Sequence, residues 1–404
     1  MKKINNFDLV CKNLGIPIVF IRKIEKSLKK FNGKIYIVGG NVRDLILNKS
    51  IINHPDLVVN LDLEKLLYCL EKAKIRFLKI GEKFGSIVVL HKKFKFDVTV
   101  MRKDIKTDGR WAKIKFTDSL EEDSKRRDFT FNSIYCDTDG HLADPNKGIN
   151  DLLNKNVRFI GDPNRRIKED YLRILRFFRF SLEISNSVDK EMSFLCEKHF
   201  KNLKSLSFER RMKETERILL NNNLNKKEII PSLQKLLECT FESKLNFTSF
   251  NEFCIFESLI NKKSFERRLK FLLRNTKDIP NFFLKSSTTH FKKRLKSQIN
   301  FKNYSNRELN MNLLKFNKIY ITDQLIIDCV KNKISRNYFD KYLMKITNYK
   351  TKKIPLTGED LLKMGFKPGK TIGKILARLE TFWVEKNFKC SKNECIKFVQ
   401  KFLP

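Results

Sequence analysis

The chain has 404 residues, of which 41% are apolar and 11% aromatic, with 84 Lys or Arg against 46 Asp or Glu and a formal net charge of +38. This much apolar material excludes a disordered chain, and the length suggests two to four domains with a sizeable core. An enzyme of small metabolites has no obvious use for the excess charge, whereas a polyanionic partner such as a nucleic acid does. An AT-rich genome that inflates lysine would explain the same numbers, and the two interpretations are compatible.

The nine cysteines form no Cys-x-x-Cys pair, and the five histidines are scattered. This pattern predicts buried free thiols in a reducing compartment, not a disulfide framework or a zinc site. No apolar run approaches 18 residues, and the start MKKINNFDLV lacks the apolar core of a signal peptide. We therefore expect a cytoplasmic protein with no membrane partner, whose oligomeric state the sequence does not indicate.

The first part of the chain alternates between strand-like and helical patterns. Residues 1–32 have the periodicity of amphipathic helices. The strands that follow are expected at Lys34–Gly40, Asp56–Asn60, Ser86–Leu90 and Phe94–Met101, and the helices at Asn41–Asn48 and Leu63–Lys74. Strands alternating with helices within about 150 residues predict an α/β domain.

The second part of the chain reads as helical from about Glu169 to the end. No glycine occurs between Gly161 and Gly358, as expected of packed helices. Within this part, residues 261–310 hold 14 Lys or Arg against three acids, with seven Phe or Tyr interleaved. Such a mixture is typical of a nucleic-acid surface, and an ordinary solvated helix face is the alternative.

A glycine pair stands between the first predicted strand and the first helix after it, in the sequence GGNVRD (residues 39–44). Glycines let the backbone approach a phosphate, and a helix N-terminus offers free N–H groups. Arg43, one turn into the helix, can add positive charge. Taken alone, this motif is equally compatible with a simple turn.

Two carboxylates are expected close to that turn. Asp56 opens the second strand directly after His54-Pro55, and Asp97 lies in a later strand beside which it could stand. A carboxylate at a strand end, near a phosphate cradle, is where a divalent metal can bind. Each aspartate alone could also be only a turn or capping residue.

Two later motifs combine charges with apolar residues. In RRDFTFN (residues 126–132), Asp128 and Asn132 are predicted to share a helical face at i,i+4. In EDYLRILR (residues 169–176), Asp170 and Arg173 are predicted on one stripe of a helix. An acceptor and a donor fixed side by side can imitate a Watson–Crick partner, and an ordinary i,i+3 ion pair is the alternative.

The motifs GGNVRD, DGR (residues 108–110), RRDFTFN and EDYLRILR resemble, in order and spacing, those of the class II tRNA nucleotidyltransferases, the CCA-adding enzymes, and of the related bacterial poly(A) polymerases. The stretch GDPNRRIKEDYLRILRFFRF is similar to that family throughout, and LTGEDLLKMGFKPGKTIGKILARLETFW resembles the tail of alphaproteobacterial members. The resemblance covers residues 34–220 and 354–384. It implies an α/β head with a mixed sheet (1–150), then a helical neck (151–220), body (221–345) and tail (346–404) that hold the tRNA.

The resemblance also implies roles for individual positions. Asp56, Asp97 and Asp128 would be the catalytic carboxylates, and the metals would be held at His54-Pro55-Asp56, with Asp97 as a nearby third acid. The other implied roles are triphosphate binding by Gly39, Gly40 and Arg43, ribose contact by Arg127, Asp128 and Asn132, base reading by Asp170 and Arg173 with Arg176 close by, a swinging hinge at Asp108, Gly109 and Arg110, and bracing by Glu209 and Arg210.

One position departs from the family pattern, because His54 stands where the family has its first metal carboxylate. Mg²⁺ prefers oxygen ligands, and an imidazole suits transition metals better, so Mn²⁺ could replace Mg²⁺ as the favoured cofactor. The implied function is addition of CCA to tRNA 3′ ends from CTP and ATP by metal-assisted phosphoryl transfer. The alternatives are a poly(A) polymerase that uses ATP only, and an RNA-binding family member whose catalysis is weakened at His54.

Overall fold

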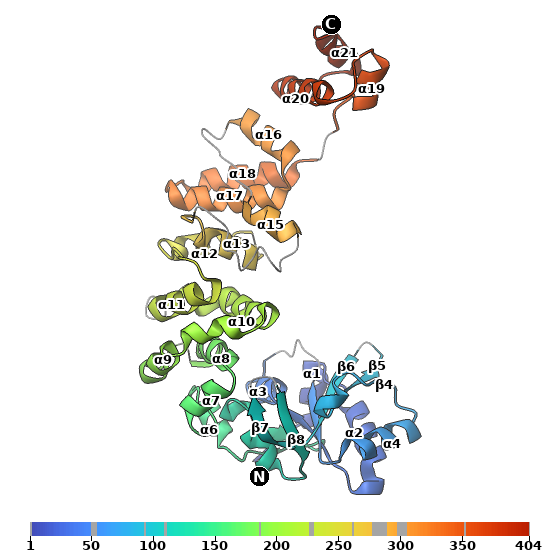
Figure 1. Cartoon of the computed structure of the whole chain (residues 1–404), viewed down its shortest axis with the longest axis vertical. Helices are drawn as coiled ribbons and strands as arrows, with labels where there is room; N and C mark the ends of the chain where they lie inside the picture. The colour runs from blue at the N-terminus through green and yellow to red at the C-terminus, as the bar shows by residue number, and fades with distance from the viewer. Residues whose placement is uncertain are drawn as a thin grey trace. The chain divides into compact units, whose positions relative to one another are not determined.

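The computed structural model shown in Figure 1 describes residues 2–49, 55–92, 94–108, 111–185, 187–225, 230–260, 262–276, 289–296, 305–350 and 353–403. The chain divides into two compact units, Met1–Thr240 and Phe241–Pro404. Within these described stretches, no helix is long and apolar enough to cross a membrane.

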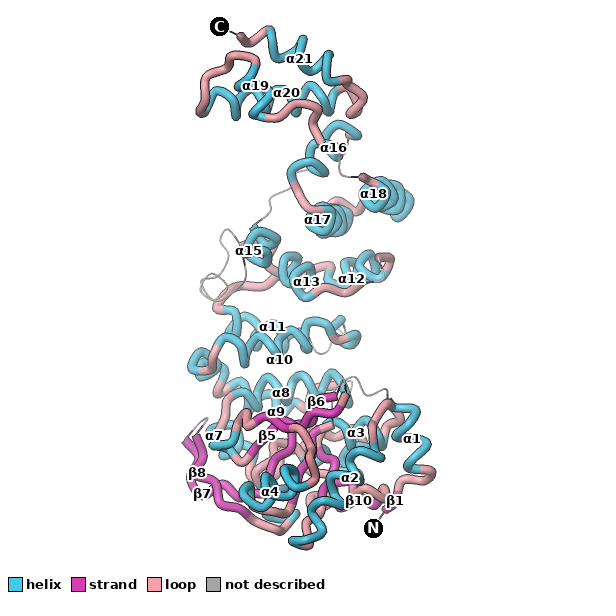
Figure 2. The backbone as a smooth tube through the Cα atoms, turned by 90° about the vertical axis from the view of Figure 1, so that its right-hand side faces the viewer, coloured by secondary structure: helices cyan, strands magenta, loops and turns pink. Residues whose placement is uncertain are grey.

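The first unit contains an eight-stranded mixed sheet with the strand order β1-β10-β9-β2-β3-β6-β5-β4. Its strands are drawn in magenta in Figure 2. Of the described strand pairs in this sheet, only β3 and β6 run parallel. The strands are β1 (Lys2–Lys3), β2 (Ile35–Val38), β3 (Asp56–Val59), β4 (Phe77–Leu78), β5 (Ser86–His91), β6 (Phe94–Val100), β9 (Tyr135–Cys136) and β10 (His141–Ala143). A separate hairpin pairs β7 (Arg102–Asp108) with β8 (Trp111–Phe116). The expected α/β head with a mixed sheet is confirmed.

Helices pack around this sheet, and more helices complete the first unit. Helix α2 contacts both α4 and β2, and α3 follows β2 directly. The carboxylate of Asp62 caps α4, accepting from the backbone N–H of Lys65 at 2.9 Å. The helices are α1 (Phe7–Leu14), α2 (Ile18–Leu28), α3 (Gly40–Ile46), α4 (Leu63–Lys72), α5 (Leu120–Lys125), α6 (Gly148–Leu153), α7 (Pro163–Glu169), α8 (Leu172–Phe180), α9 (Lys190–Glu197), α10 (Phe208–Leu220) and α11 (Ile230–Phe241).

Alternation of side chains in β5 and β6 gives this part of the sheet one closed and one open face. In β5 and β6, Ile87, Val89, Phe96 and Val98 are fully buried. The residues between them point to the other side, where Asp97 is exposed. Asp97, and Asp56 directly opposite it on β3, therefore stand on the open face.

Two expected helices are interrupted in the structure. The motif at 126–132 is not a continuous helix, because α5 ends at Lys125 and a short 3₁₀ turn covers Thr130–Asn132. The helix expected from Glu169 breaks between α7 and α8, where Asp170 has an extended backbone (φ −156°, ψ 105°). The Asp170 carboxylate accepts from the N–H of Leu172 at 3.1 Å, which competes with helix continuation.

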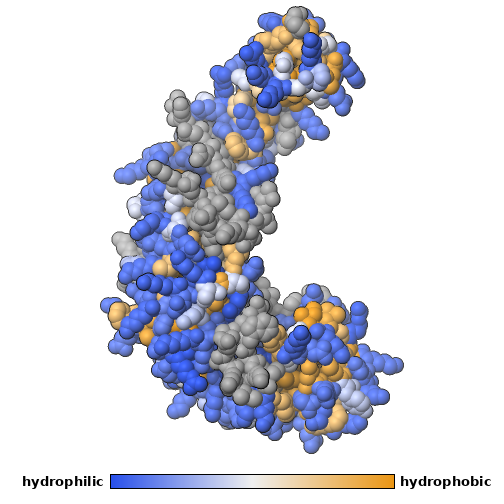
Figure 3. Space-filling model, in the orientation of Figure 1, coloured by the Kyte–Doolittle hydropathy of each residue, from blue (hydrophilic) through white to orange (hydrophobic). Residues whose placement is uncertain are grey.

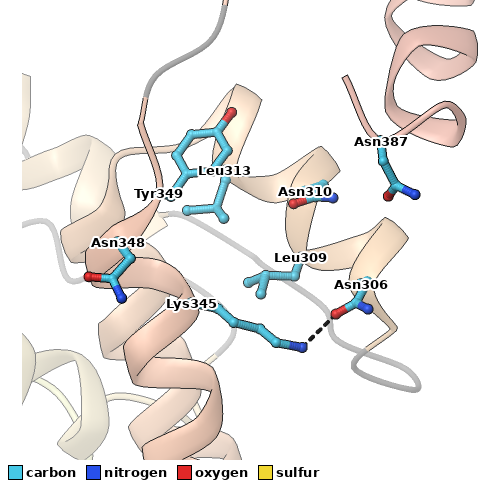
Figure 4. Close-up of a pocket in the computed structure, with 8 residues that line it drawn as sticks. All are labelled: Asn306, Leu309, Asn310, Leu313, Lys345, Asn348, Tyr349 and Asn387. Carbon is cyan, nitrogen blue, oxygen red and sulfur yellow. Dashed lines mark hydrogen bonds between the residues drawn. The ribbon is translucent and has the colours of Figure 1, made fainter. Parts of the chain in front are cut away.

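The second unit is built from helices wherever the structure describes it. They are α12 (Phe250–Ser258), α13 (Phe265–Leu272), α15 (Thr289–Lys296), α16 (Asn306–Lys315), α17 (Lys318–Lys331), α18 (Arg336–Asn348), α19 (Gly358–Lys363), α20 (Lys370–Glu385) and α21 (Lys392–Gln400). A cavity of about 330 Å³ is lined by residues of α16 and α18 together with Tyr349 and Asn387, and Lys345 Nζ donates to Asn306 Oδ1 there at 2.6 Å (Figure 4).

The basic segment 261–310 differs from the expected surface. Arg267, Arg268, Lys270 and Arg294 are each at most 8% exposed. The buried carboxylates of Glu257 and Asp323, which lie outside that segment, draw three of these cations inward: Asp323 accepts from Arg267 Nε at 2.7 Å and from Arg294 Nε at 2.6 Å, and Glu257 accepts from Arg268 Nε at 2.7 Å. This part of the prediction is wrong, because composition alone counts buried and exposed cations alike.

The nine cysteines are free thiols, seven of them buried and two half-buried, as predicted. Burial raises the pKa of Cys11 to about 12 and that of Cys254 to about 11. Such thiols stay protonated at neutral pH and have little reactivity.

Candidate active site

A cavity of about 910 Å³ opens in the first unit, between the open face of the sheet, the segment 126–132 and helices α8 and α10. Of the described residues, ten Lys or Arg and five Asp line it, an excess of five positive charges that suits a polyphosphate. The expected site residues that line it are Gly39, Gly40, Arg43, Asp56, Asp97, Arg127, Asp128, Asn132, Asp170, Arg173, Arg176 and Arg210.

The glycine turn stands next to the carboxylates. Gly39 has φ +74°, a backbone conformation that is strained for residues with a side chain. A Cβ atom added at Gly39 would lie 3.6 Å from Asp56 Oδ2. Gly40 begins α3 and faces the guanidinium of Arg43, which itself pairs with Asp44 at 3.0 Å. The backbone is therefore open at the point where a phosphate would approach.

Asp56 and Asp97 are directly opposite each other on the parallel strands β3 and β6, and both are exposed to the cavity. Among the described residues, neither carboxylate has a side-chain hydrogen bond or ion pair. The backbone N–H of Asp56 donates to Asn41 Oδ1 at 3.4 Å. Desolvation, followed by repulsion from Asp97, raises the pKa of Asp56 despite Arg127, Lys213 and Arg176. Two adjacent oxygen-donor groups with uncompensated charge fit a divalent cation.

Asp128 is fixed from three sides. It accepts from Arg176 Nε at 2.5 Å, from Asn132 Nδ2 at 3.0 Å and from the backbone N–H of Phe129 at 2.8 Å. Burial alone would raise the pKa of Asp128, but Arg176 and these hydrogen bonds lower it to about 2. The carboxylate is therefore ionised and rigid at neutral pH.

A carboxylate that sequence reasoning missed supports this wall. Asp123 is fully buried and accepts from Arg126 Nε at 2.9 Å, from Arg127 Nη2 at 2.9 Å and from the Tyr135 hydroxyl at 2.8 Å. Burial opposes ionisation of Asp123, but the two arginines outweigh it and lower its pKa. Its spacing to Arg126 and Arg127, at i,i+3 and i,i+4, was the sequence signal that could have found it.

Asp170 and Arg173 both line the cavity, but they neither share a helical face nor pair with each other. Asp170 precedes α8 and accepts from Arg210 Nη2 at 2.7 Å. Arg173 Nη1 donates to Glu169 at 2.8 Å and to the carbonyl of Arg166 at 2.6 Å. The expected shared stripe is wrong, and separate partners hold the two side chains instead.

The remaining predicted site residues lie in several places. Glu209 is exposed on α10, while Arg210 makes the contact to Asp170. Asp108 ends β7, paired with Trp111. His54, Gly109 and Arg110 lie outside the described residues. The cavity-lining residues that sequence reasoning did not single out as site residues include Leu78, Ile80, Val88, Lys95, Lys213 and Arg217.

Comparison with known proteins identifies the family to which the chain belongs. The family model described as the poly A polymerase head domain matches residues 35–158, and a putative domain 2 of tRNA nucleotidyltransferases matches residues 258–399. Human CCA tRNA nucleotidyltransferase 1, mitochondrial, is 30% identical over 94% of this chain and 90% of its own length. The chain belongs to the family of class II CCA tRNA nucleotidyltransferases. A CCA-adding enzyme of Streptococcus mutans is a further member, 26% identical over 93% of this chain and 95% of its own length.

Solved structures of the family share the fold. A Bacillus stearothermophilus CCA-adding enzyme in complex with CTP superposes with a TM-score of 0.65 at 21% identity, covering 92% of this chain and 94% of that one. A Thermotoga maritima CCA-adding enzyme complexed with tRNA has a TM-score of 0.59 at 21% identity over the full length of both chains.

Proposed function

We propose that this chain adds CCA to the 3′ ends of tRNA, using CTP and ATP. The observation that carries the proposal is one cavity that joins an open carboxylate pair, an excess of cations and a rigid Asp–Arg set at the junction of α7 and α8. The relatives that match nearly the whole chain have names that refer to CCA addition, which favours this activity over an ATP-only poly(A) polymerase.

In the proposed reaction the 3′-oxygen of the RNA forms a bond to the α-phosphorus of the nucleotide. The bond from that phosphorus to the bridging oxygen breaks, pyrophosphate leaves and the hydroxyl proton is released. Asp56 and Asp97 would hold a divalent metal, whose charge would help to activate the hydroxyl and neutralise the phosphates. Gly39, Gly40 and Arg43 would take the triphosphate. Asp128, fixed by Arg176 and Asn132, would orient the sugar.

Base selection would fall to Asp170 and Arg173. A fixed acceptor and a fixed donor select a base by its edge only if neither can turn away, and Arg210 and Glu169 provide that restraint. Arg173→Ala should lower kcat/KM for CTP and ATP by roughly thirtyfold to a thousandfold and relax discrimination against UTP and GTP. Arg165→Ala is the matched control, because Arg165 also pairs with Glu169, at 3.4 Å, but is 82% exposed. Unchanged kinetics in Arg173→Ala would remove the pair from the nucleotide site.

The metal is proposed to be Mg²⁺ or Mn²⁺, with Mn²⁺ favoured because His54 replaces a carboxylate in the sequence. His54→Asp should raise turnover in Mg²⁺ by roughly tenfold to a hundredfold and change turnover in Mn²⁺ less. A His54→Asp variant no faster in Mg²⁺ would argue that position 54 is not a ligand. Metal binding by calorimetry gives a readout that does not depend on turnover.

The direct test incubates the protein with tRNA lacking CCA and with CTP, ATP or both. We expect two C residues with CTP alone and complete CCA with both nucleotides. Long A tails from ATP alone would identify a poly(A) polymerase, and RNA binding without incorporation would identify a catalytically weakened member.

We further propose that the head is 1–150, the neck 151–220, the body 221–345 and the tail 346–404, and that the protein is cytoplasmic. Three of the relatives are named as mitochondrial, so fractionation tests the last point.

A further inference from the structure

One row of paired residues crosses the sheet beside the carboxylates. Asp56 is opposite Asp97, Asp97 is opposite Val88, and Val88 is opposite Leu78. Residues directly opposite each other on neighbouring strands point to the same face of a sheet. Leu78 and Val88 therefore continue the open face from the carboxylates toward the β4 edge, and both line the cavity.

This side of the cavity is apolar, whereas the rest is mostly charged. Leu78 is 43% exposed, and Ile80, just after β4, is 62% exposed. Val88 is half-buried beside them, and Lys95 is exposed two residues before Asp97, on the same face. The space-filling view shows apolar side chains on the head, in the area where Figure 1 labels β4, β5 and β6 (Figure 3). We call Leu78, Ile80, Val88 and Lys95 the acceptor strip.

The strip lies across the carboxylates from the glycine turn. In the strand order, Gly39 follows β2, on one side of Asp56, whereas β6, β5 and β4 lie on the other side. Phosphoryl transfer places the attacking oxygen and the leaving group on opposite sides of the phosphorus. If the triphosphate binds at the glycine turn, the attacking 3′ end must approach from the side of the strip.

We propose that the acceptor strip binds the 3′-terminal nucleotide of the RNA acceptor. Its base and ribose would rest on Leu78, Ile80 and Val88, and a backbone phosphate would bind Lys95, whose ammonium group makes no ion pair within the described part of the chain. This inference rests on the proposed function, which assigns residues to the nucleotide but none to the 3′ end of the RNA.

The side chains of the strip fit this occupant and not the incoming nucleotide. During CCA addition the terminal base of the acceptor changes at each step, so its site must accept different bases. Apolar contact tolerates any base, and a single cation binds a phosphate without reading sequence. Three aliphatic side chains offer no hydrogen bond that could select C or A, in contrast to Asp170 and Arg173.

The test compares Leu78→Ser/Ile80→Ser with the control Val19→Ser, since Val19 is 77% exposed and does not line the cavity. The double variant should raise KM for tRNA by roughly fivefold to tenfold and leave KM for CTP within about twofold. Lys95→Ala should reduce the slope of log K for RNA binding against log salt concentration by about 0.7–0.9. Lys72→Ala should leave this slope unchanged. Equal KM values for tRNA in the double variant, Val19→Ser and the wild type would overturn the inference.

A second measurement does not depend on turnover. A tRNA with 4-thiouridine as its 3′-terminal nucleotide should cross-link, on irradiation, to the peptide that contains residues 77–95. Cross-links only to peptides outside these residues would overturn the inference. Failure of the wild type to incorporate any nucleotide would overturn the proposed function instead, so the two can fail separately.

Discussion

Two regions of the molecule pair arginines with aspartates or glutamates, and only one of them is open. In the cavity of the first unit, Asp128 binds Arg176 at 2.5 Å, and in the second unit Asp323 binds Arg294 at 2.6 Å. The distances are alike, but Arg176 is 30% exposed in its side chain whereas Arg294 is 7% exposed. Geometry of a pair therefore does not distinguish a site from a structural cluster; the open space around it does.

The regions also differ in how their charges are balanced. The cavity keeps the adjacent carboxylates of Asp56 and Asp97 apart from its cations, so both kinds of charge can bind a ligand. In the buried cluster, Asp323 accepts from two arginines, and Glu257 accepts from Arg267 and Arg268. Such a cluster is costly to break and has no free acceptor face. Opposite responses to mutation follow.

The largest expected effect is on turnover, at Asp56. Asp56→Asn should reduce turnover at least about a thousandfold in either metal, because the proposed metal site would lose a negatively charged oxygen ligand. The folded state raises the pKa of Asp56, so ionisation costs stability as pH rises through this pKa, and the variant should melt at the same or a higher temperature at pH 7. Thermal melts and single-turnover assays measure both. A variant that is inactive and also less stable would place Asp56 in a structural role.

The buried cluster should show the reverse. Asp323→Ala leaves Arg267 and Arg294 without their shared acceptor and should lower the free energy of unfolding by about 3–5 kcal/mol. The protein that remains folded should keep its kcat. Asp340→Ala is the matched control, because Asp340 pairs with Arg336 at 3.7 Å on the surface and should cost at most about 1 kcal/mol. Similar losses in the two variants, measured by urea denaturation, would contradict a buried role.

The buried Lys270 should make the stability of the protein depend on pH. Burial lowers its pKa from 10.5 to about 8 in the folded protein, although Asp323 opposes the shift. Between pH 8 and 10.5 the unfolded chain binds more protons, so this residue makes stability rise with pH in that window. Lys270→Met should therefore be more stable than the wild type by roughly 2–4 kcal/mol at pH 7, and the difference should shrink above pH 8. A difference that does not change with pH would assign the effect to packing instead.

The same contrast explains what the sequence could predict. The strand pattern was sufficient to place Asp97 in a strand and to suggest that it stands beside Asp56. The break at Asp170 was not predictable from helical periodicity, because an aspartate side chain there replaces a backbone hydrogen bond. The interior position of Arg267 depends on Asp323, 56 residues away, and no local pattern shows such a partner.

The smallest expected effect concerns the solvent-exposed cations of segment 261–310. Lys262, Lys263 and Lys293 are exposed, unlike the four buried cations of this segment. If they bind the RNA backbone, changing all three to Gln should weaken tRNA binding about twofold to fivefold at physiological salt. The slope of log K for tRNA binding against log salt concentration should fall by about two.

The control for this change is a triple Gln variant of Lys72, Lys74 and Lys83, which are equally exposed in the first unit. It removes the same charge from the chain, so any effect of net charge alone appears in both proteins. KM for ATP should change in neither, because no member of either set lines the cavity. If both triple variants lose tRNA affinity equally, the segment contributes only general charge; if only the first does, its exposed lysines contact RNA while its buried arginines hold the helices together.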